Sequence, residues 1–219
     1  MTSGSPEHGD VFTEVRRGIR SWGAHEAGGI TLSTASGERW IPIAYDDRGA
    51  PYPTDETGRE RDDLLLSLSD EDDLVACAWA SPAPGSRLVG LGCDLVSIRD
   101  FAEDPRGERM AELLLTSEER TLAQTLIPDN VPASRAVLFG AKEASFKACA
   151  APLRNWYREH DEKLIFEVRH FHSVDGVTER GDARDKAAQH ALDALGIVCL
   201  SFSYTTLDDK ILVVSRALQ

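Results

Sequence analysis

Residues 138–148 read Leu-Phe-Gly-Ala-Lys-Glu-Ala-Ser-Phe-Lys-Ala and place Lys142, Glu143 and Lys147 in an otherwise small and apolar segment. Glu143 and Lys147 are four residues apart, so on a helix they lie on one face, one turn from each other. Such side chains are seldom buried without a partner. The segment indicates either a site for an anionic ligand or a metal, or a surface Glu–Lys pair worth about 0.3 kcal/mol. This window alone favours the surface pair.

A second segment shifts the balance. Residues 88–98 read Leu-Val-Gly-Leu-Gly-Cys-Asp-Leu-Val-Ser-Ile, which is the pattern of a buried strand with one carboxylate in it. With a period of two, Gly90, Gly92, Asp94 and Val96 share one face, and the glycines let a bulky group approach it closely. An unpaired carboxylate there would cost several kcal/mol (~3). Asp94 and Glu143 together would make an oxygen site suited to Mg²⁺.

The two segments resemble the paired signature of the 4′-phosphopantetheinyl transferase superfamily. The first part is Gly92–Val96, Gly-Cys-Asp-Leu-Val, and the second is Phe139–Ala148, Phe-Gly-Ala-Lys-Glu-Ala-Ser-Phe-Lys-Ala. Between them, residues 114–120 resemble the start of a family helix, and Thr116 with Glu119 makes a capping box. The likeness is to the two-half, surfactin-synthetase-activating type, with motifs like those of holo-acyl-carrier-protein synthase in the second half.

The resemblance implies an enzyme that moves 4′-phosphopantetheine from coenzyme A to a serine of an acyl or peptidyl carrier protein, in fatty-acid, polyketide or nonribosomal-peptide assembly. Mg²⁺ would be held by Asp94 and Glu143, and Glu143 would also receive the serine proton. Lys147 would contact the pyrophosphate and stabilise the leaving phosphate. Lys142 is expected to be a second phosphate contact, and Ser69 to lie at coenzyme A.

The fold class expected from the resemblance is α+β, with two pseudo-twofold-related halves in one chain. We place them at residues 1–84, with a disordered start over about 1–10, and 85–219, which carries the metal and catalytic motifs. An internal sequence repeat favours two related halves. Residues 66–78 and 200–214 each give a Ser-x-Ser strand, an acidic turn and a return strand, although amphipathic hairpins in general look alike.

Patterning predicts the following order of elements. Helices are expected over residues 11–22, 106–126 and 133–150, and a helix or an ordered turn over 183–195. Pro152 should end the third of these helices. Strands are expected near 29–32, 39–45, 64–80 (two, around an acidic turn), 88–98, 163–173, 198–204 and 210–215, and loops over 46–63 and 81–86.

Two positions depart from the family pattern. Ser69-Asp70 stands where a Ser-His pair is usual, and Asp70 would repel coenzyme A phosphates unless protonated or bridged by a metal. Gly49-Ala50-Pro51 stands in place of Gly-Lys-Pro and so lacks a cation. Val96 stands where some members carry a third acidic ligand. The arginines that might replace the missing cations are Arg16, Arg17, Arg20, Arg59 and Arg61.

Composition sets limits on partners and location. The 219-residue chain has a net charge of −13, which argues against nucleic-acid binding. Its four cysteines are scattered in apolar contexts and predict free thiols of a reducing compartment. No segment is apolar enough to span a membrane, and the start lacks a signal-peptide pattern. We therefore expect a cytoplasmic monomer.

A rival hypothesis belongs to a different class. Because Asp70 and Ala50 weaken the expected coenzyme A site, the chain is alternatively a repurposed transferase fold. Such a protein would bind a carrier protein, or act on a carrier-tethered acyl chain, without transferring phosphopantetheine. The retained Asp94, Glu143 and Lys147 argue against this alternative, because a binding protein has no need of them.

Overall fold

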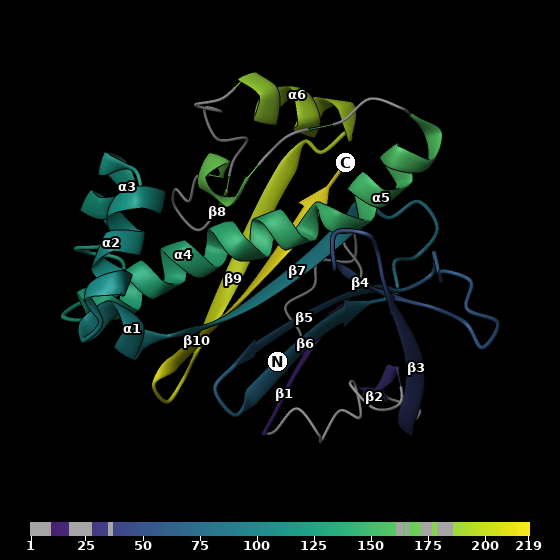
Figure 1. The fold of residues 1–219 in the computed structure, drawn as a ribbon, viewed down its shortest axis with the longest axis horizontal. Helices are drawn as coiled ribbons and strands as arrows, with labels where there is room; N and C mark the ends of the chain where they lie inside the picture. Colours follow the sequence, from purple (N-terminus) through teal and green to yellow (C-terminus); the bar gives the residue numbers. More distant parts are fainter. Residues whose placement is uncertain are drawn as a thin grey trace.

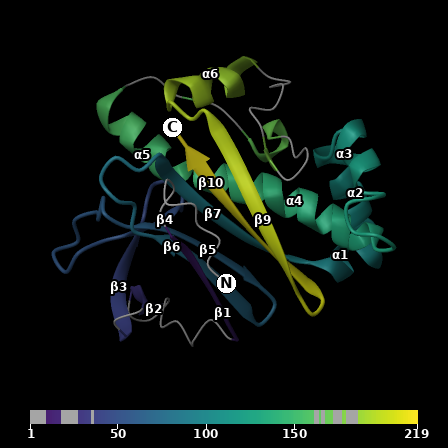
Figure 2. The same ribbon diagram turned by 180° about the vertical axis from the view of Figure 1, so that it is seen from behind.

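The computed structural model describes residues 10–17, 28–34, 37–160, 164, 167–171, 177–178 and 186–219. Strands and helices are mixed in a layered arrangement, with the long helix α4 (Val131–Ala148) lying across the strands of the C-terminal sheet (Figure 1). The N-terminal strands lie beside this sheet, away from α4 (Figures 1 and 2). No described helix has the length and apolar character needed to cross a membrane.

The N-terminal strands form two small antiparallel sheets. One has the order β1-β6-β5, and the other has the order β2-β3-β4. Their bounds are β1 Val11–Arg17, β2 Gly29–Thr34, β3 Gly37–Tyr45, β4 Pro51–Pro53, β5 Leu65–Glu71 and β6 Leu74–Ala80.

The C-terminal sheet has the order β7-β10-β9-β8, and β10 pairs antiparallel with both β7 and β9. Its strands are β7 Leu88–Ser97, β8 Val177–Thr178, β9 Cys199–Leu207 and β10 Lys210–Leu218. The remaining helices are α1 Ile98–Ala102, α2 Pro105–Leu114, α3 Ser117–Leu122, α5 Ala150–Glu159, α6 Lys186–Ala194 and the 3₁₀ turn Val168–His170.

Helix α4 packs directly onto strand β7 through glycines. A Cβ on Gly92 would lie 1.9 Å from the carbonyl oxygen of Ala144, and a Cβ on Gly90 would lie 1.9 Å from that of Ala148. Both contacts are with helix backbone, so no side-chain rotation would relieve them. The bulky group that the glycines admit is therefore the helix itself.

The two faces of β7 divide as the alternating pattern predicts. Val96 packs with α4 and β10, while Leu91, Cys93 and Leu95 pack with the alanines of β6. Strand β7 is thus buried on both faces, which accounts for its nearly continuous apolar sequence.

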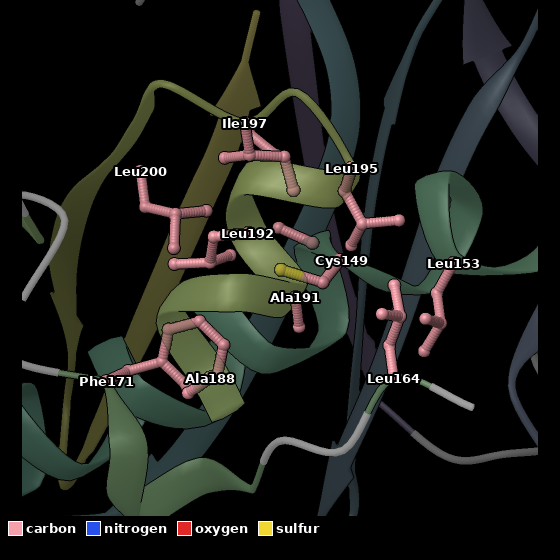
Figure 3. Close-up of a cluster of buried hydrophobic side chains, with 12 residues drawn as sticks. Cys149, Leu153, Leu164, Phe171, Ala188, Ala191, Leu192, Leu195, Ile197 and Leu200 are labelled. Carbon is pink, nitrogen blue, oxygen red and sulfur yellow. The ribbon is translucent and has the colours of Figure 1, made fainter. Parts of the chain in front are cut away.

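A separate apolar cluster fixes the other end of the C-terminal sheet. Leu192 of α6, Leu195 directly after that helix, Leu153 of α5 and Cys149 at the end of α4 meet there with Phe171 (Figure 3). This cluster holds the junction between α4 and α5 in place, because Cys149 is completely buried within it.

The predicted hairpin over residues 64–80 is confirmed as β5 and β6. It turns through Asp72, whose φ is 53°, and the hairpin of β9 and β10 turns through Asp208, whose φ is 52°. Asp tolerates this left-handed conformation better than most residues. The strand and helix predictions at 29–32, 39–45, 88–98, 183–195, 198–204 and 210–215 are confirmed as well.

Five element predictions were wrong or incomplete. Residues 51–53 form strand β4 within the predicted 46–63 loop, because they pair with β3. Residues 11–17 form β1 and not a helix, because pairing with β6 decides the conformation of this short segment. The 106–126 helix is interrupted before Thr116, which caps α3 with Glu119 as the capping box predicts. Pro152 lies in the first turn of a new helix, α5, where proline is tolerated. Residues 168–170 form a 3₁₀ turn within the predicted 163–173 strand. Residues 1–9, which include most of the start expected to be disordered, lie outside the described part.

The contact at Gly92 gives a direct test of this packing. Gly92→Ala should lower the free energy of unfolding by about 1–3 kcal/mol or more, because the helix backbone must move to admit the methyl group. Thr206→Ala, on the exposed part of β9, should change it by less than about 0.5 kcal/mol. Urea unfolding of both variants checks this, and equal small effects would contradict the close approach.

Candidate functional site

The candidate site lies on a seam between strands β5 and β7. Strand β7 pairs with β10 along one edge, and on its other edge serine hydroxyls of β5 replace backbone partners. The N–H of Cys93 donates to Ser67 Oγ at 2.9 Å, and the N–H of Leu95 donates to Ser69 Oγ at 3.1 Å. The seam therefore joins the N-terminal strands to the strand that carries Asp94.

Asp94, Lys147 and Ser69 form one hydrogen-bonded group at this seam. Lys147 Nζ donates to Asp94 Oδ1 at 2.7 Å, and Ser69 Oγ donates to the same oxygen at 3.0 Å. Lys147 Nζ also lies 3.2 Å from Ser69 Oγ. Asp94 is only 7 % exposed, so its charge is compensated by these donors rather than by water.

Glu143 lies one helical turn before Lys147 and lines the same cavity as Asp94. The cavity has a volume of about 400 Å³, and its wall carries five carboxylates and one lysine: Asp70, Glu71, Asp94, Asp100, Glu143 and Lys147. No hydrogen bond or ion pair joins Glu143 to another described residue. Its carboxylate is therefore available to a ligand.

Burial sets the protonation behaviour of this group. It raises the pKa of Asp94, and Lys147 and Ser69 oppose that rise only in part. Burial and the charge of Asp94 raise the pKa of Glu143. For Lys147, burial lowers the pKa, but Asp94 and its other anionic neighbours outweigh burial and raise it. Two carboxylates with raised pKa values in one cavity favour a bound cation.

The donor set fits Mg²⁺. Among the described residues, no three His, Cys, Asp or Glu side chains gather into a ready-made metal site. Mg²⁺ commonly takes only one or two protein carboxylates and completes its shell with water and phosphate oxygens. Asp94 and Glu143 meet that need, since both Ser69 and Lys147 occupy Oδ1 of Asp94 and leave Oδ2 to a cation.

A second cavity, of about 330 Å³, lies on the other side of Lys147. It is lined by Pro51 and Pro53, by apolar residues of β5 and β7, by the cations Arg61 and Arg154, and by the carboxylates Glu60 and Asp62. Lys147 lines both cavities, of which the first is mainly acidic and the second carries charges of both signs.

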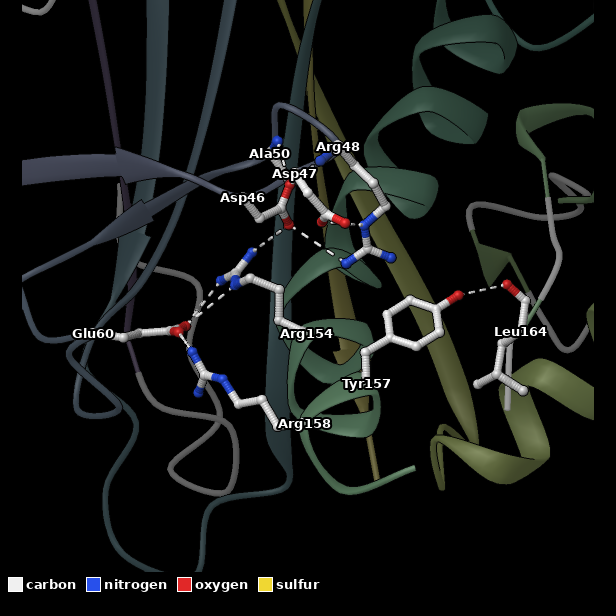
Figure 4. Close-up of polar contacts among 9 residues, drawn as sticks. All are labelled: Asp46, Asp47, Arg48, Ala50, Glu60, Arg154, Tyr157, Arg158 and Leu164. Carbon is white, nitrogen blue, oxygen red and sulfur yellow. Dashed lines mark hydrogen bonds and ion pairs between the residues drawn. The ribbon is translucent and has the colours of Figure 1, made fainter. Parts of the chain in front are cut away.

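An ion-pair network closes the far wall of the second cavity (Figure 4). Arg154 of α5 donates from Nε and Nη2 to Glu60 Oε1 at 3.3 and 3.2 Å, and Arg158 also pairs with Glu60. Arg154 Nη1 lies 3.8 Å from Asp46 Oδ2. The network ties α5 to the segment between β3 and β5, and thus the C-terminal part of the chain to the N-terminal part.

Comparison with known proteins identifies this region. Residues 90–193 match the family model described as the 4′-phosphopantetheinyl transferase superfamily. These residues are similar to that superfamily over slightly less than half of the chain. The match spans β7, α4 and α6, so Asp94, Glu143 and Lys147 all lie inside the matched region. A comparison with curated protein sequences found no match.

Solved structures include similar chains. A holo-[acyl-carrier-protein] synthase from Neisseria meningitidis is 22% identical, with 60% of this chain and 99% of that chain covered and a TM-score of 0.42. The holo-ACP-synthase from Plasmodium yoelii is 15% identical, with 60% and 94% covered and a TM-score of 0.40. An acyl carrier protein synthase from Mycobacterium tuberculosis is 25% identical, with 59% and 96% covered and a TM-score of 0.36.

Within the matched region the structure places Lys142 apart from the other predicted site residues. Its side chain is 0 % exposed, and its ammonium group pairs with Glu119 Oε2 at 3.0 Å and donates to the carbonyl oxygen of Phe171. The predicted role of Lys142 as a phosphate contact needs access that this position does not give. Lys142 points away because it precedes Glu143 and is rotated about 100° from it around the helix.

The Lys142–Glu119 pair instead anchors α3 to α4. Glu119 is 1 % exposed, and its carboxylate also accepts the N–H of Thr116 at 2.7 Å, while Thr116 Oγ1 accepts the N–H of Glu119 at 3.1 Å. The capping box seen in the sequence is thus extended by a buried lysine. Sequence spacing alone did not indicate this contact.

The departures from the family pattern have clear positions. Asp70 is exposed at the wall of the acidic cavity, where solvent screens its charge. The Ala50 N–H donates to Asp46 at 2.9 Å.

Among the arginines considered as replacements, Arg61 lines the second cavity, whereas Arg16 pairs with Glu14 and Arg20 lies outside the described residues. Arg154, which also lines the second cavity, is not among the arginines expected from the sequence.

Removing Lys142 should reveal its structural role. Lys142→Met should lower the free energy of unfolding by about 3–5 kcal/mol, because it leaves Glu119 buried without its cation. The double variant Lys142→Met/Glu119→Gln should be more stable than the single variant. Chemical denaturation measures both. Normal stability of Lys142→Met together with weakened binding of coenzyme A would contradict the structural role and indicate that Lys142 contacts a phosphate.

Glu143 should destabilise the unliganded fold at neutral pH. Burial raises the pKa of Glu143 in the folded state above its ordinary value, so stability falls as pH rises from the unfolded-state pKa to the folded-state pKa and then levels off. Glu143→Gln should therefore raise the unfolding temperature by a few degrees at pH 7.5 and leave it unchanged below about pH 4, where both states are protonated. Thermal unfolding at both pH values checks this, and a loss of stability at pH 7.5 would contradict it.

Proposed function

We propose that the protein is a Mg²⁺-dependent 4′-phosphopantetheinyl transferase that acts on a serine of an acyl or peptidyl carrier protein with coenzyme A as donor. The observation that carries the proposal is the meeting of Asp94, Glu143 and Lys147 at one cavity within the matched domain. Two carboxylates for a cation and one lysine for a phosphate are the groups that transfer from a pyrophosphate requires.

The reaction proposed for this site is a displacement at phosphorus. The carrier serine oxygen forms a bond to the β-phosphorus of coenzyme A, the bond from that phosphorus to the bridging oxygen breaks, and adenosine 3′,5′-bisphosphate leaves. Glu143 receives the serine proton, directly or through water. Lys147 stabilises the charge on the leaving phosphate. Mg²⁺, when bound by Asp94 and Glu143, supplies charge neutralisation at the pyrophosphate.

The position of Lys147 supports a placement for the donor. Its ammonium group borders both cavities, so a pyrophosphate held there would leave the pantetheine arm and the nucleotide on opposite sides. We assign the nucleotide to the cavity lined by Arg61 and Arg154, because this wall carries two arginines beside Glu60 and Asp62, whereas apart from Lys147 the charged groups of the other wall are all carboxylates. This arrangement needs neither a lysine at position 50 nor a histidine at position 70.

We also propose that the chain consists of two related halves, residues 1–84 and 85–219. The strand orders support this, because β6 lies between β1 and β5 just as β10 lies between β7 and β9. The likeness extends to the two Asp-containing turns, but the described residues between 10 and 84 contain no helix. A cytoplasmic location and a monomeric state remain part of the same proposal.

The alternative is a transferase-fold protein that binds a carrier, or acts on a tethered acyl chain, without phosphopantetheinyl transfer. The acidic wall of the catalytic cavity, with Asp70 and Asp100 beside Asp94 and Glu143, is the observation that favours it. Without bound cations such a wall repels a pyrophosphate.

Intact-mass spectrometry distinguishes the two functions. Apo carrier proteins incubated with the protein, coenzyme A and Mg²⁺ should gain one phosphopantetheine, and a chelator should abolish the gain. Asp94→Ala and Glu143→Gln should each reduce the rate by about 10³-fold or more while circular dichroism shows a folded chain. Glu159→Gln, on the exposed end of α5, is the matched control and should keep normal activity. Near-normal turnover of either site variant would overturn the metal-site assignment.

A further inference from the structure

The hydroxyl of Ser69 makes all its hydrogen bonds to protein groups, whereas a contact with coenzyme A would need a free donor or acceptor. Its hydroxyl donates to Asp94 Oδ1 at 3.0 Å and accepts hydrogen bonds from the Leu95 N–H at 3.1 Å and from Lys147 Nζ at 3.2 Å. A serine hydroxyl has one hydrogen and two lone pairs. All three are used within the protein, so Ser69 has no capacity left for a phosphate of the donor.

We propose that Ser69 is a positioning residue that holds Asp94 and Lys147 in the arrangement required for the cation and the phosphate. This inference rests on the proposed transferase function. Ser69 directs its hydrogen to Oδ1 of Asp94 and so leaves Oδ2 to the cation, while its lone pair holds the ammonium group of Lys147 at the border of the two cavities.

Three features of the site favour positioning. Ser69 is 8 % exposed and lies on β5, a regular strand, so its own position is well defined. Its hydrogen bond to the Leu95 N–H fixes the hydroxyl against the strand that carries Asp94. Residues that orient a metal ligand in this way commonly affect metal affinity or activity by 10–100-fold.

The same strand supplies a matched control. Ser67 Oγ accepts the Cys93 N–H at 2.9 Å, so it makes the same kind of bond to the edge of β7 as Ser69 does. No described hydrogen bond joins Ser67 to Asp94 or Lys147. Ser67→Ala therefore removes a hydrogen bond across the seam and keeps the hydrogen bonds among Ser69, Asp94 and Lys147. The variant thus shows how much activity depends on the seam alone, without any change at Asp94 or Lys147.

The experiment compares Ser69→Ala, Ser69→Thr and Ser67→Ala in the full chain. Mn²⁺ binding is followed by electron paramagnetic resonance, and transfer to an apo carrier by intact mass. Ser69→Ala should weaken Mn²⁺ binding about tenfold and lower kcat by about 10–100-fold with little change in KM for coenzyme A. Ser69→Thr, which keeps the hydroxyl, should restore most of both, and Ser67→Ala should change neither by more than about twofold.

Several outcomes would overturn the proposal. If Ser69→Ala raises only the KM for coenzyme A, Ser69 contacts coenzyme A and does not position Asp94. If Ser67→Ala has the same effect as Ser69→Ala, the effect comes from weakening the seam between β5 and β7. Absence of Mn²⁺ binding by the wild type would also reject it. If the wild type binds Mn²⁺ but modifies no carrier, the proposed function fails, while the Mn²⁺ affinities still decide the role of Ser69.

Discussion

The site depends on one packing constraint, the direct contact between the backbone of α4 and strand β7. Gly90 and Gly92 leave no room for a Cβ against the carbonyl oxygens of Ala148 and Ala144. Because the helix lies so close to the strand, a short lysine-to-aspartate contact of 2.7 Å forms between Lys147 and Asp94, which are 53 residues apart. A larger residue at either glycine would move Lys147 and Glu143 of α4 away from Asp94 of β7.

The N-terminal strands complete the site from the other side of β7. The serines of β5 satisfy the free edge of that strand, and the ion pairs of Arg154 with Glu60 and Asp46 hold α5 against the N-terminal segment. Both sets of contacts border the cavities at Lys147. The arrangement therefore requires both parts of the chain, although the matched superfamily domain covers only residues 90–193.

Much of this site was predictable from sequence, because the period of two in β7 and the four-residue spacing in α4 fix which side chains share a face. Those rules placed Asp94 beside the helix and Glu143 beside Lys147. They did not separate Lys142 from Lys147, since the partner of Lys142, Glu119, lies on another helix. The fold of β1 was also missed, because seven residues become a strand only through pairing with β6. Arg154 was missed because its cavity exists only once α5 meets the N-terminal segment.

The central claim is that the contact of α4 with β7 creates one cation and phosphate site between Asp94, Glu143 and Lys147. A crystal structure of the protein with coenzyme A and Mn²⁺, with anomalous data collected for manganese, tests it most directly. The account predicts an anomalous peak bonded to Asp94 Oδ2 and Glu143, with the pyrophosphate beside Lys147 and the nucleotide in the cavity of Arg61 and Arg154. Manganese or coenzyme A bound elsewhere, with Asp94 and Glu143 uncoordinated, would contradict it.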